Sequence, residues 1–195
     1  MKFVLASKNP KKLEELRDIL SAQGVEVVGE ADVGVDVDVE ETGATFYENA
    51  CLKAQAVMQA TGLPAVADDS GLCVDALNGA PGVYSARYGG PDLDDPGRCR
   101  LLLENMRGML DRRCSFVSVV VCCFPNGDLV TGQGRCDGTL AYAPRGDNGF
   151  GYDPIFFVPA LKKTFAQLTP EEKNAISHRG NALADFQAKL ADYLK

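Results

Sequence analysis

Two pairs of adjacent carboxylates are the first groups in the sequence that could do chemistry. Glu40 and Glu41 are followed by threonine and glycine, and Asp68 and Asp69 by serine and glycine, so both pairs are expected in loops at element ends. Mg²⁺ commonly takes one or two carboxylate oxygens from protein and its other ligands from water and substrate phosphate. The pairs therefore indicate metal-assisted phosphoanhydride hydrolysis; solvent-exposed turn acids and helix caps are the alternative interpretation.

A lysine-rich segment near the N-terminus has the features of a phosphate-binding loop. Residues 7–12 (SKNPKK) follow a short apolar run and precede a helical pattern, which places them between a strand and a helix start. Free backbone N–H groups and the positive end of the helix dipole favour an anion at such a position, and lysine adds charge. The glycines of a P-loop are absent. A turn followed by a solvated lysine face is the alternative.

Two later segments could bind a nucleobase. Residues 146–154 (GDNGFGYDP) form a glycine-rich loop, in which glycine lets the backbone approach a flat ligand and an aromatic ring can stack on a base. Residues 172–179 (EKNAISHR) place a lysine, the only histidine and an arginine around a predicted helix start. The alternatives are an irregular turn with Phe150 in the core and a structural histidine.

Strands and helices alternate in the elements that must position these segments. Hydrophobic periodicity, capping residues and turn signals define them. We expect strands over 2–6, 25–28 and 65–67, helices over 11–20, 45–61 and 96–110 (the last capped by Asp94 or Asp95), a hairpin of 114–124 and 129–136 around Asn126-Gly127, a helix start at Thr169-Pro170, and a last helix from Ser177 to about 194. The fold class is therefore α/β, with a mixed sheet that contains an antiparallel hairpin.

Composition limits the protein class. A chain of 195 residues with 46% hydrophobic residues is expected to form one domain over residues 1–195. We find no apolar run near the roughly 20 residues that span a bilayer and no signal peptide, which favours a cytoplasmic protein without a membrane partner. The seven scattered cysteines are expected to be reduced core thiols. A net charge of −7 argues against a nucleic-acid partner.

Together and in this order, the motifs resemble those of the inosine triphosphate pyrophosphatase family. The likeness spans nearly the whole chain and is carried by S-x-N-x-x-K, E-E-T-G-x-T-F-x-E-N-A, A-D-D-S-G-L, G-A-P-G-V-Y-S-A-R-Y, F-G-Y-D-P-I-F and E-K-N-A-I-S-H-R. Each motif alone is weak to moderate, but six in sequence are very specific. The resemblance implies an elongated mixed sheet flanked by helices, two lobes with a cleft between them, and a homodimer.

The resemblance also implies an activity, which is hydrolysis of ITP, dITP and XTP to the monophosphate and pyrophosphate with Mg²⁺ as cofactor. Glu40 and Asp69 would bind the metal, with Glu41 and Asp68 as possible substitutes, and Asp69 would also be the general base. The triphosphate would be bound by Ser7, Lys8, Asn9, Pro10, Lys11, Lys12 and Lys53. The rest of the nucleotide would be bound by Ser70, Phe150, Gly151, Tyr152, Asp153, Lys173, His178 and Arg179, with Phe150 stacking on the purine.

One departure and two other hypotheses accompany this prediction. The family often has glycine after the first residue of the opening loop, where this chain has Lys8. A nucleotide pyrophosphatase of different base preference would reverse the ranking in a substrate panel. A non-catalytic nucleotide-sensing module would bind ITP without hydrolysing it.

Overall fold

The computed structural model describes residues 1–21 and 23–195 and divides the chain into two compact units. Unit 1 comprises Met1–Asp69, Ser118–Gly134 and Ala182–Lys195, and unit 2 comprises Ser70–Val117 and Arg135–Asn181. The strands form a seven-stranded sheet with the order β2-β1-β3-β4-β5-β6-β7. The predicted α/β class, with a mixed sheet flanked by helices, is confirmed. One domain over residues 1–195, with a cleft between two lobes, stays a prediction.

Unit 1 contains the parallel part of the sheet. Strand β1 (Lys2–Leu5) pairs in parallel with β2 (Glu26–Gly29), in a register that runs from Lys2 opposite Glu26 to Leu5 opposite Gly29. On its other side β1 pairs in parallel with the start of β3 (Ala65–Val74), where Val4 lies opposite Ala65. Parallel strands are usually covered on both faces, and the nearly continuous apolar sequence of β1 fits that position.

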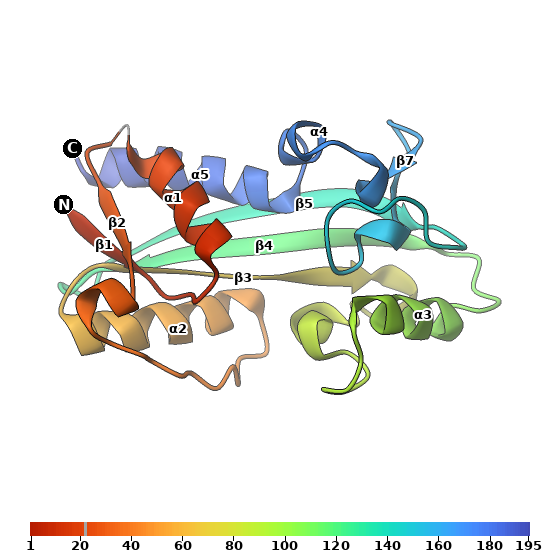
Figure 1. The fold of residues 1–195 in the computed structure, drawn as a ribbon, viewed down its shortest axis with the longest axis horizontal. Helices are drawn as coiled ribbons and strands as arrows, with labels where there is room; N and C mark the ends of the chain where they lie inside the picture. Colours follow the sequence, from red (N-terminus) through yellow and green to blue (C-terminus); the bar gives the residue numbers. More distant parts are fainter. Residues whose placement is uncertain (22) are drawn as a thin grey trace. The chain divides into compact units, whose positions relative to one another are not determined.

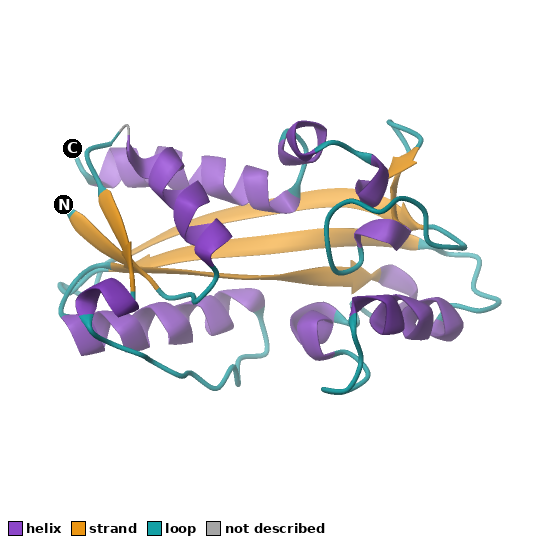
Figure 2. Ribbon diagram, viewed as in Figure 1, coloured by secondary structure: helices purple, strands orange, loops and turns teal. Residues whose placement is uncertain are grey.

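Helices cover both faces of the unit 1 strands (Figures 1 and 2). Alternate side chains of a strand point to opposite faces, so Phe3 and Val4 belong to different cores. Phe3 packs in a cluster with residues of α1 (Pro10–Ser21) and α5 (His178–Tyr193), and Val4 packs in a cluster with residues of α2 (Phe46–Thr61). The sheet of unit 1 is therefore a middle layer between α1 and α5 on one face and α2 on the other.

The predicted cap of α2 is confirmed in detail. The Thr45 hydroxyl accepts a hydrogen bond from the Glu48 N–H at 3.1 Å, and the Glu48 carboxylate accepts one from the Thr45 N–H at 3.1 Å. Gly62 ends the helix with a φ of 68°, a left-handed conformation that glycine adopts without steric cost. Both ends of the helix are thus fixed by local sequence.

Unit 2 has a predominantly antiparallel sheet and a core rich in phenylalanine. It contains the end of β3, the start of β4 (Arg113–Cys123), the end of β5 (Leu129–Leu140), β6 (Phe156–Val158), β7 (Lys163–Thr164), α3 (Asp95–Asn105) and α4 (Pro170–Asn174). Strand β6 pairs antiparallel with both β5 and β7. Phe156 and Phe165 are fully buried in its core, and their ring centroids lie 4.6 Å apart.

Three sequence-based expectations were wrong. Asp68 and Asp69 lie within β3, not in a loop, because the strand continues to Val74 and buries Leu72 and Val74. The helix expected over 96–110 ends at Asn105. Gly108, with a φ of 79°, lies in the turn that follows it. Finally, β5 extends beyond 136 to Leu140, and β6 and β7 were not predicted.

Two compositional expectations can be compared with the structure. All seven cysteines are free thiols, and six of them are buried, as expected for reduced core residues. Over residues 1–21 and 23–195, no helix combines the length and apolar character that crossing a membrane requires.

Candidate functional site

Unit 1 brings together a group of charged side chains that we call the lysine–carboxylate cluster, defined by Lys12, Glu41, Lys53, Asp68 and Asp69. Lys12 lies in the first turns of α1, and its ammonium donates to both carboxylate oxygens of Asp68 at 2.8 Å. Asp68 is 8% exposed, so its carboxylate is shielded from water, whereas the Lys12 side chain is 25% exposed. The side chain of a lysine in the predicted phosphate loop therefore lies against one of the predicted metal carboxylates.

Lys53 of α2 joins the other carboxylates. Its ammonium donates to Glu41 at 2.7 Å and to the backbone oxygen of Asp68 at 2.8 Å, and it lies 3.9 Å from the Asp69 carboxylate. Two ammonium groups thus meet three carboxylates in the cluster. A cation would be attracted by the excess negative charge, and a polyphosphate could exchange with carboxylates as the partner of the lysines.

Asp69 is held by a residue that the sequence analysis missed. Asn49 is fully buried in α2, and its amide nitrogen donates to Asp69 Oδ2 at 3.1 Å. Its amide oxygen accepts from the Gly43 N–H at 2.8 Å, so Asn49 also fixes the segment after Glu41. A Cβ on Gly43 would lie 2.6 Å from that oxygen, which explains the glycine. In the sequence, the feature that could have indicated this role is the asparagine of the E-N-A motif, which directly follows the capping residue Glu48.

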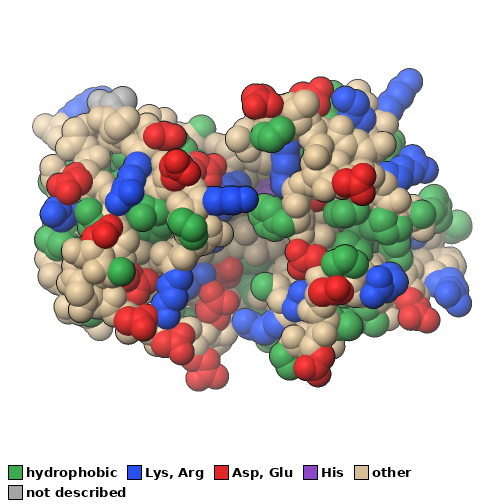
Figure 3. Space-filling view, viewed as in Figure 1, with side chains coloured by type: hydrophobic (Ala, Val, Ile, Leu, Met, Phe, Trp, Pro, Cys, Tyr) green, Lys and Arg blue, Asp and Glu red, His purple; other side chains and the backbone are tan. Residues whose placement is uncertain are grey.

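The remaining residues of the opening loop serve the start of α1. The Asn9 amide oxygen accepts from the Lys11 N–H at 3.0 Å, and Ser7 accepts from the Asn9 N–H at 3.3 Å. Pro10 is the first helical residue. Lys8 pairs with Asp36 at 2.6 Å on the surface. Figure 3 shows such basic and acidic side chains beside one another.

The donor set of unit 1 fits a magnesium ion. Among the described residues, no group of three or more histidine, cysteine or acidic side chains has the arrangement of a complete metal site. Mg²⁺ does not require one, because it is bound by one or two carboxylates with waters and phosphate oxygens. Asp69 offers such a carboxylate within the cluster. The side chain of Glu40 is exposed and lies beside Glu41, outside the hydrogen-bonded group of described residues.

In unit 2, the predicted base-binding segment forms a turn that we call the Phe150 loop, residues 146–153. Gly149 and Gly151 adopt left-handed conformations with φ of 77° and 60°. A Cβ on Gly149 would lie 2.0 Å from the Asp153 carboxylate, so only glycine fits there. Phe150 between them is 75% exposed. The alternative that Phe150 packs in the core is wrong.

Lys173 and Asp153 lie next to the Phe150 ring. The Lys173 ammonium is 4.8 Å from the ring centroid and forms an ion pair with Asp153. Asp153, which is 2% exposed, also accepts from the Phe150 N–H at 2.9 Å. Burial raises the pKa of Asp153 above its ordinary value, while the Lys173 charge and the Phe150 N–H oppose that rise. An exposed ring thus has a fixed backbone and a cation over its face.

Aromatic contacts connect Lys173 to His178 within unit 2. The Lys173 ammonium is 5.5 Å from the Phe165 ring centroid, and Phe165 stacks on Phe116 at 5.8 Å. Phe116 stacks in turn on the His178 ring at 4.6 Å. The preceding Ser177 caps α5 by accepting from the Gly180 N–H at 3.0 Å, as predicted. Arg179 is half-buried in the first turn of the same helix, and Ser70 is half-buried in β3.

Tyr152 contributes to the core. It is 5% exposed, and its hydroxyl donates to the Ser85 backbone oxygen at 2.8 Å. Burial raises the pKa of the Tyr152 hydroxyl, which keeps it protonated as a donor. Its part in ligand binding would therefore be to anchor the Phe150 loop.

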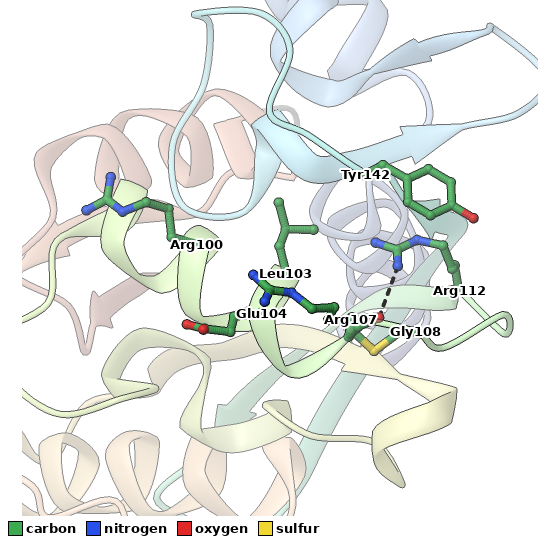
Figure 4. Close-up of a pocket in the computed structure, with 8 residues that line it drawn as sticks. Arg100, Leu103, Glu104, Arg107, Gly108, Arg112 and Tyr142 are labelled. Atoms are coloured by element: carbon green, nitrogen blue, oxygen red, sulfur yellow. Dashed lines mark hydrogen bonds between the residues drawn. The ribbon is translucent and has the colours of Figure 1, made fainter.

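A surface pocket of about 470 Å³ lies at the end of α3 in unit 2 (Figure 4). Arg112, one of the residues that line it, makes contacts that stabilise the fold. Arg112 is buried there, donates to the Leu140 and Ala141 carbonyls at 2.8 and 2.9 Å, and lies 4.3 Å from the Tyr142 ring centroid. It also reaches the Met106 carbonyl beyond the helix C-terminus at 3.4 Å, where a cation is favoured. The predicted site residues do not line this pocket.

Comparisons with known proteins identify relatives over the whole chain. The model of the Ham1 family matches residues 3–189. A protein of Exiguobacterium sp. named dITP/XTP pyrophosphatase is 46% identical over 195 residues, covering 100% of both chains. The solved Ham1 protein of Staphylococcus aureus is 44% identical with a TM-score of 0.94, covering 99% of this chain and 100% of that one. The solved nucleoside-triphosphatase / dITP/XTP pyrophosphatase of Mycobacterium abscessus is 50% identical with a TM-score of 0.83, covering 94% of this chain and 97% of that one.

Proposed function

Because the chain belongs to the Ham1 family, we propose that it hydrolyses noncanonical purine nucleoside triphosphates, such as ITP, dITP and XTP, to the monophosphate and pyrophosphate. The chain covers 100% of the Exiguobacterium relative and 97% of the Mycobacterium abscessus structure. The inosine triphosphate pyrophosphatase resemblance of the motifs agrees with these names. We propose further that residues 1–195 act as one catalytic domain in a cytoplasmic homodimer.

The lysine–carboxylate cluster would bind the triphosphate and Mg²⁺. The observation that carries the proposal is that Lys12 and Lys53, which are far apart in sequence, both meet the Asp68-Asp69 pair. A polyphosphate would take over the two ammonium groups, and Asp69 with Glu40 or Glu41 would hold the metal. Bound Mg²⁺ would supply positive charge that stabilises the charge developing on the phosphate oxygens.

Asp69 would act as the general base. Water attacks the α-phosphorus, the bond from that phosphorus to the bridging oxygen breaks, and pyrophosphate leaves. Asp69 accepts the proton of the attacking water. Asn49 occupies Oδ2 of Asp69 with a hydrogen bond, which orients the carboxylate. The ammonium groups of Lys12 and Lys53 stabilise the negative charge of the leaving pyrophosphate. Because water attacks the phosphorus directly, no covalent enzyme intermediate forms.

The unit 2 residues would select the base. The exposed Phe150 ring would stack on the purine, and Lys173, His178 and Arg179 would offer donors to its 6-keto oxygen. Adenine presents a 6-amino group to those donors, and an unpaired buried polar group costs about 1–3 kcal/mol. Two such mismatches would exclude ATP by several orders of magnitude.

A substrate panel tests the proposal. Pyrophosphate release from ITP, dITP, XTP, GTP, ATP and dUTP is measured with coupled inorganic pyrophosphatase, with and without Mg²⁺. Magnesium-dependent release that is largest for the 6-keto purines other than GTP is expected. A ranking led by dUTP or ATP would favour a pyrophosphatase of different base preference. Tight ITP binding without pyrophosphate release would favour a nucleotide-sensing module.

A further inference from the structure

Two side chains of α3 fasten the Phe150 loop to unit 2. The Asp95 carboxylate accepts a hydrogen bond from the Gly151 N–H at 2.8 Å. The Cys99 thiol donates to the carbonyl oxygen of the same residue at 3.3 Å. Asp95 and Cys99 are four residues apart in α3 and thus lie on one face of the helix. Both backbone polar groups of Gly151 are therefore bound by a helix that lies outside the loop motif.

The chemistry of both side chains suits a permanent attachment. The other oxygen of Asp95 lies 3.4 Å from the Arg98 guanidinium, which fixes the orientation of the carboxylate. Cys99 is 2% exposed, and burial raises the pKa of its thiol to about 11. The thiol therefore keeps its proton near neutral pH and remains a donor.

The Asp95 side chain is not needed to cap α3. The N-cap is its neighbour Asp94, whose carboxylate accepts from the Gly97 N–H at 2.7 Å. The start of the helix thus has its cap, and the Asp95 carboxylate is directed to the Phe150 loop. Substituting Asp94 therefore tests the stability of the helix, and substituting Asp95 tests the attachment of the loop.

The loop is also anchored on the other side of Phe150. The Asn148 N–H donates to the Ala166 carbonyl at 3.1 Å, and the Asn148 amide donates to the Leu168 carbonyl at 3.1 Å. Phe150 therefore lies between two attached residues while its ring is 75% exposed. Because the backbone on both sides of the ring is fixed, little backbone conformational entropy is lost when a flat ligand stacks on it.

We infer that Asp95, assisted by Cys99, is a positioning residue that holds the Phe150 loop in the conformation that stacks on the base. It sets the affinity for the purine ring and leaves the affinity for phosphate unchanged. This inference rests on the proposed function, because it takes Phe150 as the stacking residue.

A fluorescence experiment tests the positioning without requiring activity. The chain contains no tryptophan, so Phe150→Trp introduces its only tryptophan at the tip of the loop, and the indole can be excited separately from the six tyrosines. Acrylamide quenching and anisotropy decay are measured on the ligand-free protein. Adding Asp95→Ala is expected to increase both the quenching constant and the fast local motion of the indole. Asp94→Ala is the matched control, since it removes the helix cap but no contact with Gly151. Equal effects of both substitutions, or no effect of Asp95→Ala, would overturn the inference.

Kinetics on the chain with Phe150 intact supply the second measurement. Asp95→Ala is expected to raise KM for ITP about three- to tenfold with little change in kcat, which is the scale of the net contribution of one ordinary hydrogen bond. Inhibition by inorganic pyrophosphate, which has no base, should be unchanged. Asp95→Asn should restore most of the affinity because its amide oxygen still accepts from Gly151. Parallel weakening of ITP and pyrophosphate would contradict the inference. If the wild type hydrolysed no purine triphosphate, the proposed function would fail, while the fluorescence result would still decide the positioning role.

Discussion

The two groups of candidate residues are built by different means. In unit 1, the lysine–carboxylate cluster consists of long charged side chains that neutralise one another, with Lys12 and Lys53 shared among three carboxylates. In unit 2, the Phe150 loop consists of glycines and backbone hydrogen bonds that present one exposed ring. A phosphate ligand would have to exchange the partners of the lysines, whereas a base would meet a surface that is already arranged.

This contrast suggests a division of labour. Charge rearrangement is suited to the reacting phosphates, because the electrostatic environment can change as the metal and substrate enter. A fixed ring is suited to recognition, because ordering costs are avoided. Substitutions in unit 1 should therefore act mainly on kcat, and substitutions in the Phe150 loop mainly on KM.

The largest effect is expected at Asp69. Asp69→Asn should lower kcat by about 10²- to 10⁴-fold, since a carboxamide cannot accept the proton of the attacking water. Nucleotide binding, measured by calorimetry with ITP, should be largely retained. Asp68→Asn is the comparison, because Asp68 lies next to Asp69 but pairs with Lys12. Full activity of the Asp69 variant, or an equal kcat loss in both variants, would remove the special role given to Asp69.

A smaller loss of kcat is expected at Asn49. Asn49→Leu deletes the donor to Asp69 and leaves the Gly43 N–H without its acceptor, so kcat should fall about tenfold or more. The free energy of unfolding, from urea denaturation, should decrease by about 1–3 kcal/mol. Asn49→Asp keeps an acceptor for Gly43 but brings a second carboxylate to Asp69. Wild-type kcat in this second variant would show that the donor to Asp69 is unimportant.

Phe150 should show the opposite kinetic pattern. Phe150→Ala is expected to raise KM for ITP about tenfold, because stacking on an aromatic side chain contributes about 1–3 kcal/mol per base. Stability to urea should hardly change, since the ring is 75% exposed. Phe150→Tyr retains a ring and should stay close to the wild type. A fall in kcat with unchanged KM would break the division between the two groups.

The smallest effect concerns the pH dependence of stability. The pKa of Asp153 is raised by burial, so the folded protein keeps this proton at pH values where the unfolded chain has released it. The contribution of Asp153 to stability is therefore greatest below its ordinary titration and is lost as pH rises through the raised pKa. The free energy of unfolding, measured with urea from about pH 4 upward, should decrease with pH in the wild type. This decrease should be absent in Asp153→Asn.

Asp111 provides a control of opposite sign within unit 2. Its hydrogen bonds with Arg113 lower the pKa of Asp111 to about 2, so its stabilising contribution is present above the ordinary carboxyl pKa and is lost as pH falls. Asp111→Asn should leave the slope assigned to Asp153 in place. Identical pH profiles for the wild type and Asp153→Asn would contradict the assignment.

Local features were predictable from sequence, and long-range partners were not. The caps at Thr45, Thr169 and Ser177 depend on residues within three positions, and the structure has all of them. The bond between Lys12 and Asp68 joins residues 56 positions apart. Periodicity and capping rules contain no information about such a pairing; the motif resemblance supplied the expectation that these residues belong to one site.

The wrong loop at Asp68 and Asp69 has a physical cause that local sequence does not contain. Acidic and glycine residues at 68–71 indicate a turn locally, but β3 continues through them because neighbouring strands pair with it and Leu72 and Val74 enter the core. The contact of Asn49 with Asp69 and the contact of Asp95 with Gly151 were not predicted, for a related reason. Each side chain has its partner on another element, whereas in the sequence Asn49 looked like an ordinary helix residue and Asp95 like a candidate helix cap.

The seven thiols, six of which are buried, have a practical consequence for studying local opening. Cys51, Cys122 and Cys123 belong to unit 1, and Cys73, Cys99, Cys114 and Cys136 to unit 2. Burial raises the pKa of every one, for example to about 11 for Cys123 and about 12 for Cys114, which slows alkylation of the folded chain. Iodoacetamide pulses followed by peptide mass spectrometry would then measure how fast each thiol becomes exposed. The cysteines of the chain therefore report local opening separately in each unit, without any added label.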